Sequence, residues 1–210
     1  MKYGLALHTS SPALGLAISS NADDLRCQTW DLGRETSNYL HSHLLDFLSP
    51  QTWQDLAWLA VANGPGGFTG TRLAVVTART LGQQLKLPVF TISSLAAIAW
   101  QSQQVGSIAI SMSAQRGEVF GAIYNRSIDR QELTTILPDT VFSATDWHTQ
   151  LAHFEHLHYH IIPQSANLAD TVAGVLALAR IAYDRAERPD WSTAIPFYGQ
   201  HPIVTSSIGK

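Results

Sequence analysis

The chain changes repeatedly between the two-residue period of a strand and the 3.6-residue period of a helix, which predicts an α/β fold. Three short apolar runs, joined by links rich in Ser, Pro, Asn and Asp, indicate strands at Tyr3–His8, Leu14–Ser19 and Arg26–Asp31. A helical period follows over Asn38–Leu48. The next run, Trp58–Ala62, is continuously apolar, so we expect a strand that is buried on both faces.

The same order of elements returns in the second half of the chain. The first half ends with a helix, a strand and a serine-capped helix, predicted at Thr71–Leu85, at Pro88–Ile92 and from Ser93 or Ser94 to about Gln103. The second half is predicted to hold strands at Ser107–Ser111, Glu118–Tyr124 and Glu132–Leu137, a short helix after Thr145 or Asp146, a strand at His158–Ile162 and a helix at Leu168–Ala186. Strand-strand-strand-helix-strand-helix therefore occurs twice, without matching residues. The polar stretch Gln101–Gln104 predicts a boundary between residues 1–104 and 105–210.

A Gly-rich stretch, N-G-P-G-G-F-T-G-T-R over Asn63–Arg72, lies between a predicted strand and a predicted helix. This order is typical of a phosphate-binding loop. The stretch nevertheless fits neither G-x-x-x-x-G-K-[ST] nor G-x-G-x-x-G, because Thr69 and Thr71 stand where further glycines are needed and no lysine is present. A structural strand-to-helix turn, stiffened by Pro65, is therefore favoured over a phosphate site.

The same stretch resembles the G-P-G-S-F-T-G-x-R signature of the TsaB (YeaZ) family, whose members help to form threonylcarbamoyladenosine in tRNA. The resemblance rests on Gly64, Pro65, Gly66, Gly67, Phe68, Thr69, Gly70 and Arg72. A second segment, Ala114–Phe120, is similar to the family's D-A-R-R-G-E-V-Y through Arg116, Gly117 and Glu118. The resemblance covers about residues 1–125. It implies the actin/Hsp70-like α/β fold, which is built from two ribonuclease-H-like halves.

Two acidic residues that the resemblance leads us to expect are replaced in this chain. Members of this fold that use ATP need an acid at the end of the first strand to hold Mg²⁺, and the family commonly has Asp there. Here that residue is His8, and Ser113 stands at the acidic position of the second motif. A neutral imidazole is a poor ligand for Mg²⁺. Phosphoryl transfer by this chain is therefore disfavoured.

Histidines and serines offer two other kinds of chemistry, neither of which is well supported. His153, His156, His158 and His160 lie close in sequence, but zinc needs three or four converging ligands and the only acid among them is Glu155. Ser10 or Ser94 could serve as a nucleophile, but G-x-S-x-G is absent. We therefore expect no catalytic residue, no metal site and no cofactor.

Composition narrows the location and the partners of the chain. Hydrophobic residues make up 45% of it and charged residues 14%, the latter well below the roughly 25% that is typical of soluble domains. The net charge is −3, and no basic stripe is visible, so any contact with tRNA is expected to be indirect. The single Cys27 excludes an intramolecular disulfide, and the longest apolar helical region contains Asp170 and Arg180. We expect a cytoplasmic protein that does not bind membranes.

The predicted helix Thr71–Leu85 has two apolar faces, which indicates that it packs on two sides. One face, expected to pack on the sheet, comprises Ala74, Val75, Ala78, Leu81, Gly82 and Leu85. The second is expected to bind a partner together with residues of the preceding helix, and the predicted interface comprises His41, Leu45, Leu73, Val76, Thr77 and Thr80. The resemblance implies that the partner is a TsaD-like catalytic subunit, that a TsaE-like ATPase joins the complex, and that the chain forms a homodimer when alone.

The resemblance thus implies a non-catalytic scaffold that is required for threonylcarbamoyladenosine formation beside the anticodon of tRNAs that read ANN codons. Two alternatives remain open. The first is an actin-fold ATPase or kinase that is active on its own. The second is a metallopeptidase-like enzyme, for which His156 and His160 have the spacing of an H-x-x-x-H metal pair, although on a predicted strand.

Overall fold

The computed structural model describes residues 2–21, 23–127, 132–162, 167–197 and 199. The first sheet has the strand order β3-β2-β1-β4-β5. Its strands are β1 (Tyr3–His8), β2 (Ala13–Ser19), β3 (Arg26–Asp31), β4 (Leu56–Ala62) and β5 (Val89–Ile92). Strand β2 is antiparallel to both β1 and β3, whereas β4 runs parallel to β1 and to β5. This is the topology of a ribonuclease-H-like half.

The second sheet repeats the first with one strand fewer among the described residues. Its order is β8-β7-β6-β9, with strands β6 (Gly106–Ser113), β7 (Glu118–Ser127), β8 (Glu132–Ser143) and β9 (His160–Ile162). Strands β6, β7 and β8 are antiparallel, and β9 is parallel to β6. The duplicated order of elements is therefore confirmed, and the chain has the predicted actin/Hsp70-like α/β fold.

Five α-helices and short 3₁₀ turns connect the described strands. The helices are α1 (Thr36–Leu48), α2 (Phe68–Leu85), α3 (Ser94–Gln101), α4 (Ala144–His153) and α5 (Val172–Asp184). The turns are η1 (Gly33–Glu35), η2 (Trp53–Asp55), η3 (Gln115–Gly117), η4 (Glu155–Leu157), η5 (Leu168–Thr171) and η6 (Trp191–Thr193).

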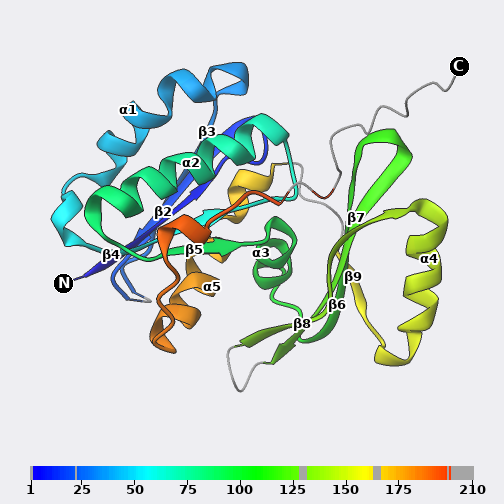
Figure 1. Cartoon of the computed structure of the whole chain (residues 1–210). Helices are drawn as coiled ribbons and strands as arrows, with labels where there is room; N and C mark the ends of the chain where they lie inside the picture. Colours follow the sequence, from blue (N-terminus) through cyan, green and yellow to red (C-terminus); the bar gives the residue numbers. More distant parts are fainter. Residues whose placement is uncertain (1, 22, 128–131, 163–166, 198, 200–210) are drawn as a thin grey trace, which may run out of the picture.

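The two halves exchange helices across their boundary. Helices α1 and α2 cover one face of the first sheet over a core that includes Leu5, Leu16 and Leu40. The other face, which includes Ala6 and Trp58, is covered by α5, although α5 follows the second sheet in the chain. Helix α3 follows the first sheet but packs on β6, β7 and β8. Figure 1 shows the two sheets side by side with α3 between them.

The exchanged helices also touch each other closely. A Cβ atom on Gly174 of α5 would lie 2.7 Å from the carbonyl oxygen of Ala97 in α3, so only glycine permits this contact without movement of the backbone. We propose that residues 1–104 and 105–210 are the two repeated halves, as the sequence predicts. The helix packing joins them into a single folded body.

Several predicted element ends differ from the structure for local reasons. Helix α2 begins at Phe68 rather than Thr71, so part of the Gly-rich stretch forms the first helical turn. The predicted helix Leu168–Ala186 is divided into a 3₁₀ turn and α5. Strand β9 begins at His160, because His158 adopts a left-handed conformation with φ 49° that ends the preceding turn.

Candidate functional site

The Gly-rich turn between β4 and α2 packs directly on the turn between β1 and β2. A Cβ atom on Gly66 would lie 2.5 Å from the Cβ and carbonyl oxygen of Ser10, and one on Gly70 would lie 1.9 Å from the carbonyl oxygen of Thr9. The amide of Gly67 donates to the carbonyl oxygen of Ser10 at 2.7 Å. Two of the family-motif glycines are thus required for close backbone packing. The space in front of the first turn of α2 is occupied by protein backbone.

Side chains strengthen this contact between the two turns. The hydroxyl of Thr9 donates to the carbonyl oxygen of Gly70 at 2.7 Å, and the hydroxyl of Thr71 donates to that of Ser10 at 3.0 Å. Thr9 and Ser10 are both buried. Gly64 has φ 102°, which is compatible with glycine alone at low cost, and the Gly64–Pro65 peptide is cis. The residues of the turn are therefore used for packing and backbone geometry.

His8 lies at the end of β1, where ATP-using members of the fold carry an acid. Its side chain is completely buried. Its Nδ1 accepts the amide N–H of Ser10 at 3.3 Å, which leaves the proton of the neutral ring on Nε2. Nε2 has no hydrogen-bond partner among the described residues. Burial lowers the pKa of His8 to about 3, so the ring is neutral at physiological pH.

A segment of the second half closes over the β1–β2 turn. The hydroxyl of Ser11 donates to the side-chain oxygen of Asn167 at 2.7 Å and accepts the amide of Ala169 at 3.2 Å. The carbonyl oxygen of Ala169 lies 2.3 Å from where a Cβ atom on Gly15 would stand. Direct contacts therefore join η5 to the strands β1 and β2.

The second motif forms the exposed turn between β6 and β7. Arg116 and Gly117 have positive φ angles of 61° and 76°, which form the left-handed part of this turn. Arg116 is exposed, Glu118 begins β7, and Ser113 is exposed at the end of β6. Phe120, at the end of the motif, is buried and meets the ring of Phe197 with their centroids 6.3 Å apart.

A C-terminal segment links the two motif segments, and sequence reasoning did not find it. The amide of Phe197 donates to the carbonyl oxygen of Asn63 at 2.7 Å. Arg79 of α2 donates to the carbonyl oxygen of Ala194 at 3.0 Å. Both acceptors are main-chain oxygens, which every residue carries, and Phe197 donates through its main-chain amide, so the sequence gives no signal for this contact.

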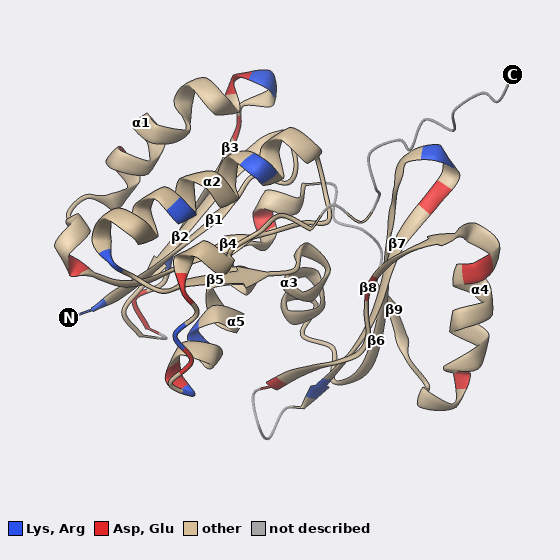
Figure 2. Cartoon of the chain, in the orientation of Figure 1, with Lys and Arg blue, Asp and Glu red and all other residues tan. Residues whose placement is uncertain are grey.

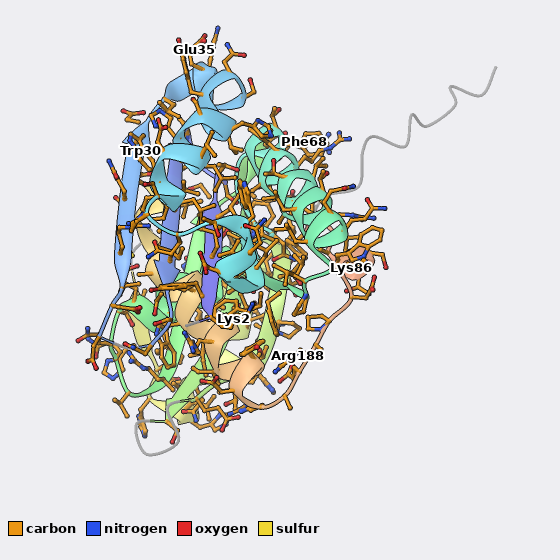
Figure 3. All side chains as sticks on the ribbon, turned by 90° about the vertical axis from the view of Figure 1, so that its left-hand side faces the viewer. Lys2, Trp30, Glu35, Phe68, Lys86 and Arg188 are labelled. Atoms are coloured by element: carbon orange, nitrogen blue, oxygen red, sulfur yellow. The ribbon has the colours of Figure 1, made fainter. Side chains whose placement is uncertain are left out.

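The predicted interface lies on the outer side of α1 and α2, and most of its residues are accessible. Leu45 and Val76 are 60% and 59% exposed, and His41 and Thr80 are exposed as well. The charged residues within the two helices are Asp46 of α1 and Arg72 and Arg79 of α2, and Figure 2 shows two basic positions on α2. Figure 3 shows α1 and α2 side by side, with Phe68 at the first turn of α2 and Lys86 just after its end.

Thr77 was wrongly assigned to the predicted interface, and Leu73 is only partly accessible to a partner. Thr77 is 6% exposed, because it shares a helix stripe with Ala74 and Leu81, which pack into the core under α2. Leu73 is half-buried and packs against the same core. Phe68, which the sequence placed in the turn, is 57% exposed and stacks with Arg72, whose guanidinium lies 5.1 Å from the ring centre. We call His41, Leu45, Phe68, Val76 and Thr80 the α1–α2 face.

The histidine-rich region shows ring contacts instead of a metal site. His153 and His156 both lie against the ring of Phe154, with centroids 5.0 and 6.4 Å from it. In the part of the chain that the structure describes, no group of three or more His, Cys, Asp or Glu residues is placed to hold a metal ion. None of the described helices is long and apolar enough to cross a membrane.

Comparisons with known proteins place these features in context. Residues 49–200 match the family model described as TsaD, tRNA N6-adenosine threonylcarbamoyltransferase. The chain is 32% identical over 149 residues to the tRNA threonylcarbamoyladenosine biosynthesis protein TsaB of Bacillus subtilis, a match that covers 68% of this chain and 63% of that protein. It is 33% identical over 131 residues to TsaB of Escherichia coli, covering 58% of this chain and 54% of that protein. The matches thus span less than two thirds of the length of either relative.

The fold is shared with a solved structure over nearly the whole chain. A protein from Pseudomonas aeruginosa, described as similar to the peptidase YeaZ, superimposes with a TM-score of 0.78 at 24% identity. The superposition covers 95% of this chain and 100% of that one. At this identity the likeness shows the fold.

Proposed function

This chain belongs to the TsaB (YeaZ) family, and on that premise we propose that it is a non-catalytic subunit required for threonylcarbamoyladenosine formation beside the anticodon of ANN-reading tRNAs. It acts by binding a TsaD-like catalytic subunit through the α1–α2 face. A TsaE-like ATPase joins this complex, and a TsaC-like enzyme supplies threonylcarbamoyl-adenylate. When the chain is alone, the same face joins two copies into a homodimer.

The observation that carries the non-catalytic role is the burial of His8. An acid at this position would have to face a metal ion and phosphate groups, whereas His8 is fully buried and neutral. The contacts of Gly66 and Gly70 with the β1–β2 turn, and of Ala169 with Gly15, leave no room for a Cβ atom at these three glycines. These features support packing roles for the motif and argue against an ATPase or kinase.

The observation that supports a protein partner is the exposed apolar content of the α1–α2 face. Leu45, Phe68 and Val76 are each more than half exposed. Exposed apolar side chains are typical of interface cores, where arginine is also enriched, and Arg72 stacks on Phe68 in the same exposed stripe of α2. A cytoplasmic protein partner that covers this face agrees with the low content of charged residues in the chain, 14%.

A reconstitution experiment tests the proposal. The purified chain, a TsaD-like protein, a TsaE-like ATPase and a source of threonylcarbamoyl-adenylate are combined with an unmodified ANN-reading tRNA, and the modified nucleoside is measured by mass spectrometry. We expect product only when both the chain and the TsaD-like protein are present. Product formed by the chain without the TsaD-like protein, or equal product when the chain is omitted, contradicts the proposal.

A further inference from the structure

A cavity of about 420 Å³ lies between α5, the junction of β5 with α3, and the β7–β8 hairpin. Helix α5 covers the face of the first sheet opposite to α1 and α2, so the cavity is separate from the α1–α2 face. Its volume falls in the range of about 300–1,000 Å³ that small-molecule sites occupy. Much of its lining is aliphatic, and includes Ile92, Leu133, Leu178 and Ile181.

Two acidic side chains line this cavity, Glu132 and Asp139, and that of Asp139 is held by neutral groups. Asp139 of β8 lines it and accepts hydrogen bonds from the hydroxyls of Tyr124 and Ser93. The Ser93 oxygen also accepts the amides of Leu95 and Ala96 at 3.0 and 3.2 Å, so its own proton is directed to Asp139. Both side-chain donors to the carboxylate are neutral. A carboxylate has about four acceptor sites, so these two bonds leave capacity for a further donor.

The charge of Asp139 is not balanced by a cation of the described chain. Arg185 also lines the cavity, but it forms an ion pair with Glu132 at 3.1 Å, and Glu132 is part of the lining as well. Their charges offset each other, so the ionised form of Asp139 carries the remaining charge of the lining. Burial raises the pKa of Asp139, against the effect of its two hydrogen bonds. A cation bound beside it would favour the ionised form.

We propose that this cavity binds a small primary amine, whose ammonium group is held by Asp139 and whose aliphatic chain lies against Leu178 and Ile181. An ammonium group has three donors and a positive charge, which match the free acceptor capacity and the net charge of the site. The aliphatic lining accommodates an apolar chain, and the second acid of the lining, Glu132, is already paired with Arg185. This site goes beyond the scaffold role and does not depend on it.

A charge series on the unaltered protein tests the proposal first. Hexylammonium chloride and hexan-1-ol, which differ mainly in the charged group, are titrated into the full chain at neutral pH by calorimetry or ligand-observed NMR. We expect hexylammonium to bind at least about 10-fold more tightly than hexan-1-ol, because a charged hydrogen bond is formed only by the amine. Equal affinities, or no binding of hexylammonium at millimolar concentration, overturn the proposal.

Two pairs of variants then locate the binding. Thr135 lines the cavity and is the cross-strand partner of Tyr124, whereas Thr134 is not part of the lining, and both threonines are exposed. Thr135→Arg places a cation at the mouth, and we expect it to weaken hexylammonium binding about 10-fold or more, while Thr134→Arg has little effect. Equal effects of the two variants would contradict binding of hexylammonium in this cavity.

Asp139→Asn removes the charge at nearly constant shape and is compared with Asp184→Asn, which alters an exposed carboxylate outside the cavity. We expect only Asp139→Asn to abolish the preference for hexylammonium over hexan-1-ol. Circular dichroism establishes that each variant is folded. If Asp139→Asn does not fold, the Thr135→Arg and Thr134→Arg pair decides. A preference that survives in folded Asp139→Asn overturns the proposal.

Discussion

The carbonyl oxygen of Thr9 lies 1.9 Å from where a Cβ atom on Gly70 would stand, while the Thr9 hydroxyl donates to the Gly70 carbonyl at 2.7 Å. Gly70→Ala must therefore displace backbone, and we expect it to lower the free energy of unfolding by at least about 2 kcal/mol. Gly67→Ala is the matched control, because its nearest neighbour would be at 3.4 Å and its φ of −59° suits any residue. Urea unfolding measures both, and equal losses would refute the packing role assigned to Gly70.

Val76→Arg tests the α1–α2 face. Val76 is 59% exposed, so the fold should survive, which circular dichroism melting can establish. In a buried interface the new cation would lack a partner and cost about 2–5 kcal/mol, or about 30-fold or more in affinity for the TsaD-like subunit and for a second copy. Val105→Arg, at a 46% exposed valine in the link before β6, is the control. If calorimetry and gel filtration find both variants alike, the interface lies elsewhere.

The buried His8 makes stability depend on pH. Its folded pKa of about 3 lies below the ordinary histidine value of 6.5, so between these two values the unfolded chain binds a proton that the folded chain does not. Stability should therefore fall as pH decreases from about 6.5 towards 3, by up to about 1.4 kcal/mol per pH unit from this group. In His8→Asn, where the amide oxygen can still accept the Ser10 amide, this part of the slope should disappear.

Chemical unfolding at a series of pH values measures the slope for the natural chain and for His8→Asn. His158→Asn is the control, because His158 is exposed in the folded chain and lies outside the α1–α2 face. Identical slopes for the natural chain and His8→Asn would show that His8 does not control the acid sensitivity.

Direct tRNA binding by the chain alone should be weak. The net charge is −3, and Figure 2 shows Lys and Arg scattered among acidic residues without a continuous basic stripe in the described part. Affinity should therefore be in the non-specific range, with a dissociation constant of roughly 10⁻⁴ M or weaker at physiological salt. Fluorescence anisotropy with labelled tRNA measures it, and a micromolar, tRNA-selective complex without any partner would argue against an indirect role.

The duplicated fold could be predicted because strand and helix periods are properties of local sequence. The apolar run of β4 and the spacing of Leu40, Leu44 and Phe47 in α1 are visible without any tertiary information. The exchange of α3 and α5 was not predicted, because an amphipathic helix shows which face is apolar but not which sheet covers it. The structure alone assigns α5 to the first sheet.

The candidate sites were predicted less completely. Thr77 was assigned to the outer face although it stands next to Ala74 and Leu81 at the border of the two faces, and the sequence does not show how far the packed side of a helix extends. Because α2 begins at Phe68, its exposed stripe comprises Phe68, Arg72, Val76 and Thr80. The cavity around Asp139 combines residues from β5, β8 and α5, and no local spacing connects these segments. Sites of this kind depend on tertiary packing that one sequence does not reveal.

The exchange of helices has a consequence for how the chain folds while it is being synthesised. Residues 1–104 contain the whole first sheet but not α5, so the apolar face formed by Ala6, Trp58 and Phe90 has no cover until residues 172–184 have been made. The second sheet, in contrast, is synthesised after α3, so the helix that packs on it is already present. We therefore expect the newly made N-terminal half to be prone to aggregation until α5 covers this face. A fragment that ends at residue 104 should remain insoluble unless residues 105–210 are supplied with it.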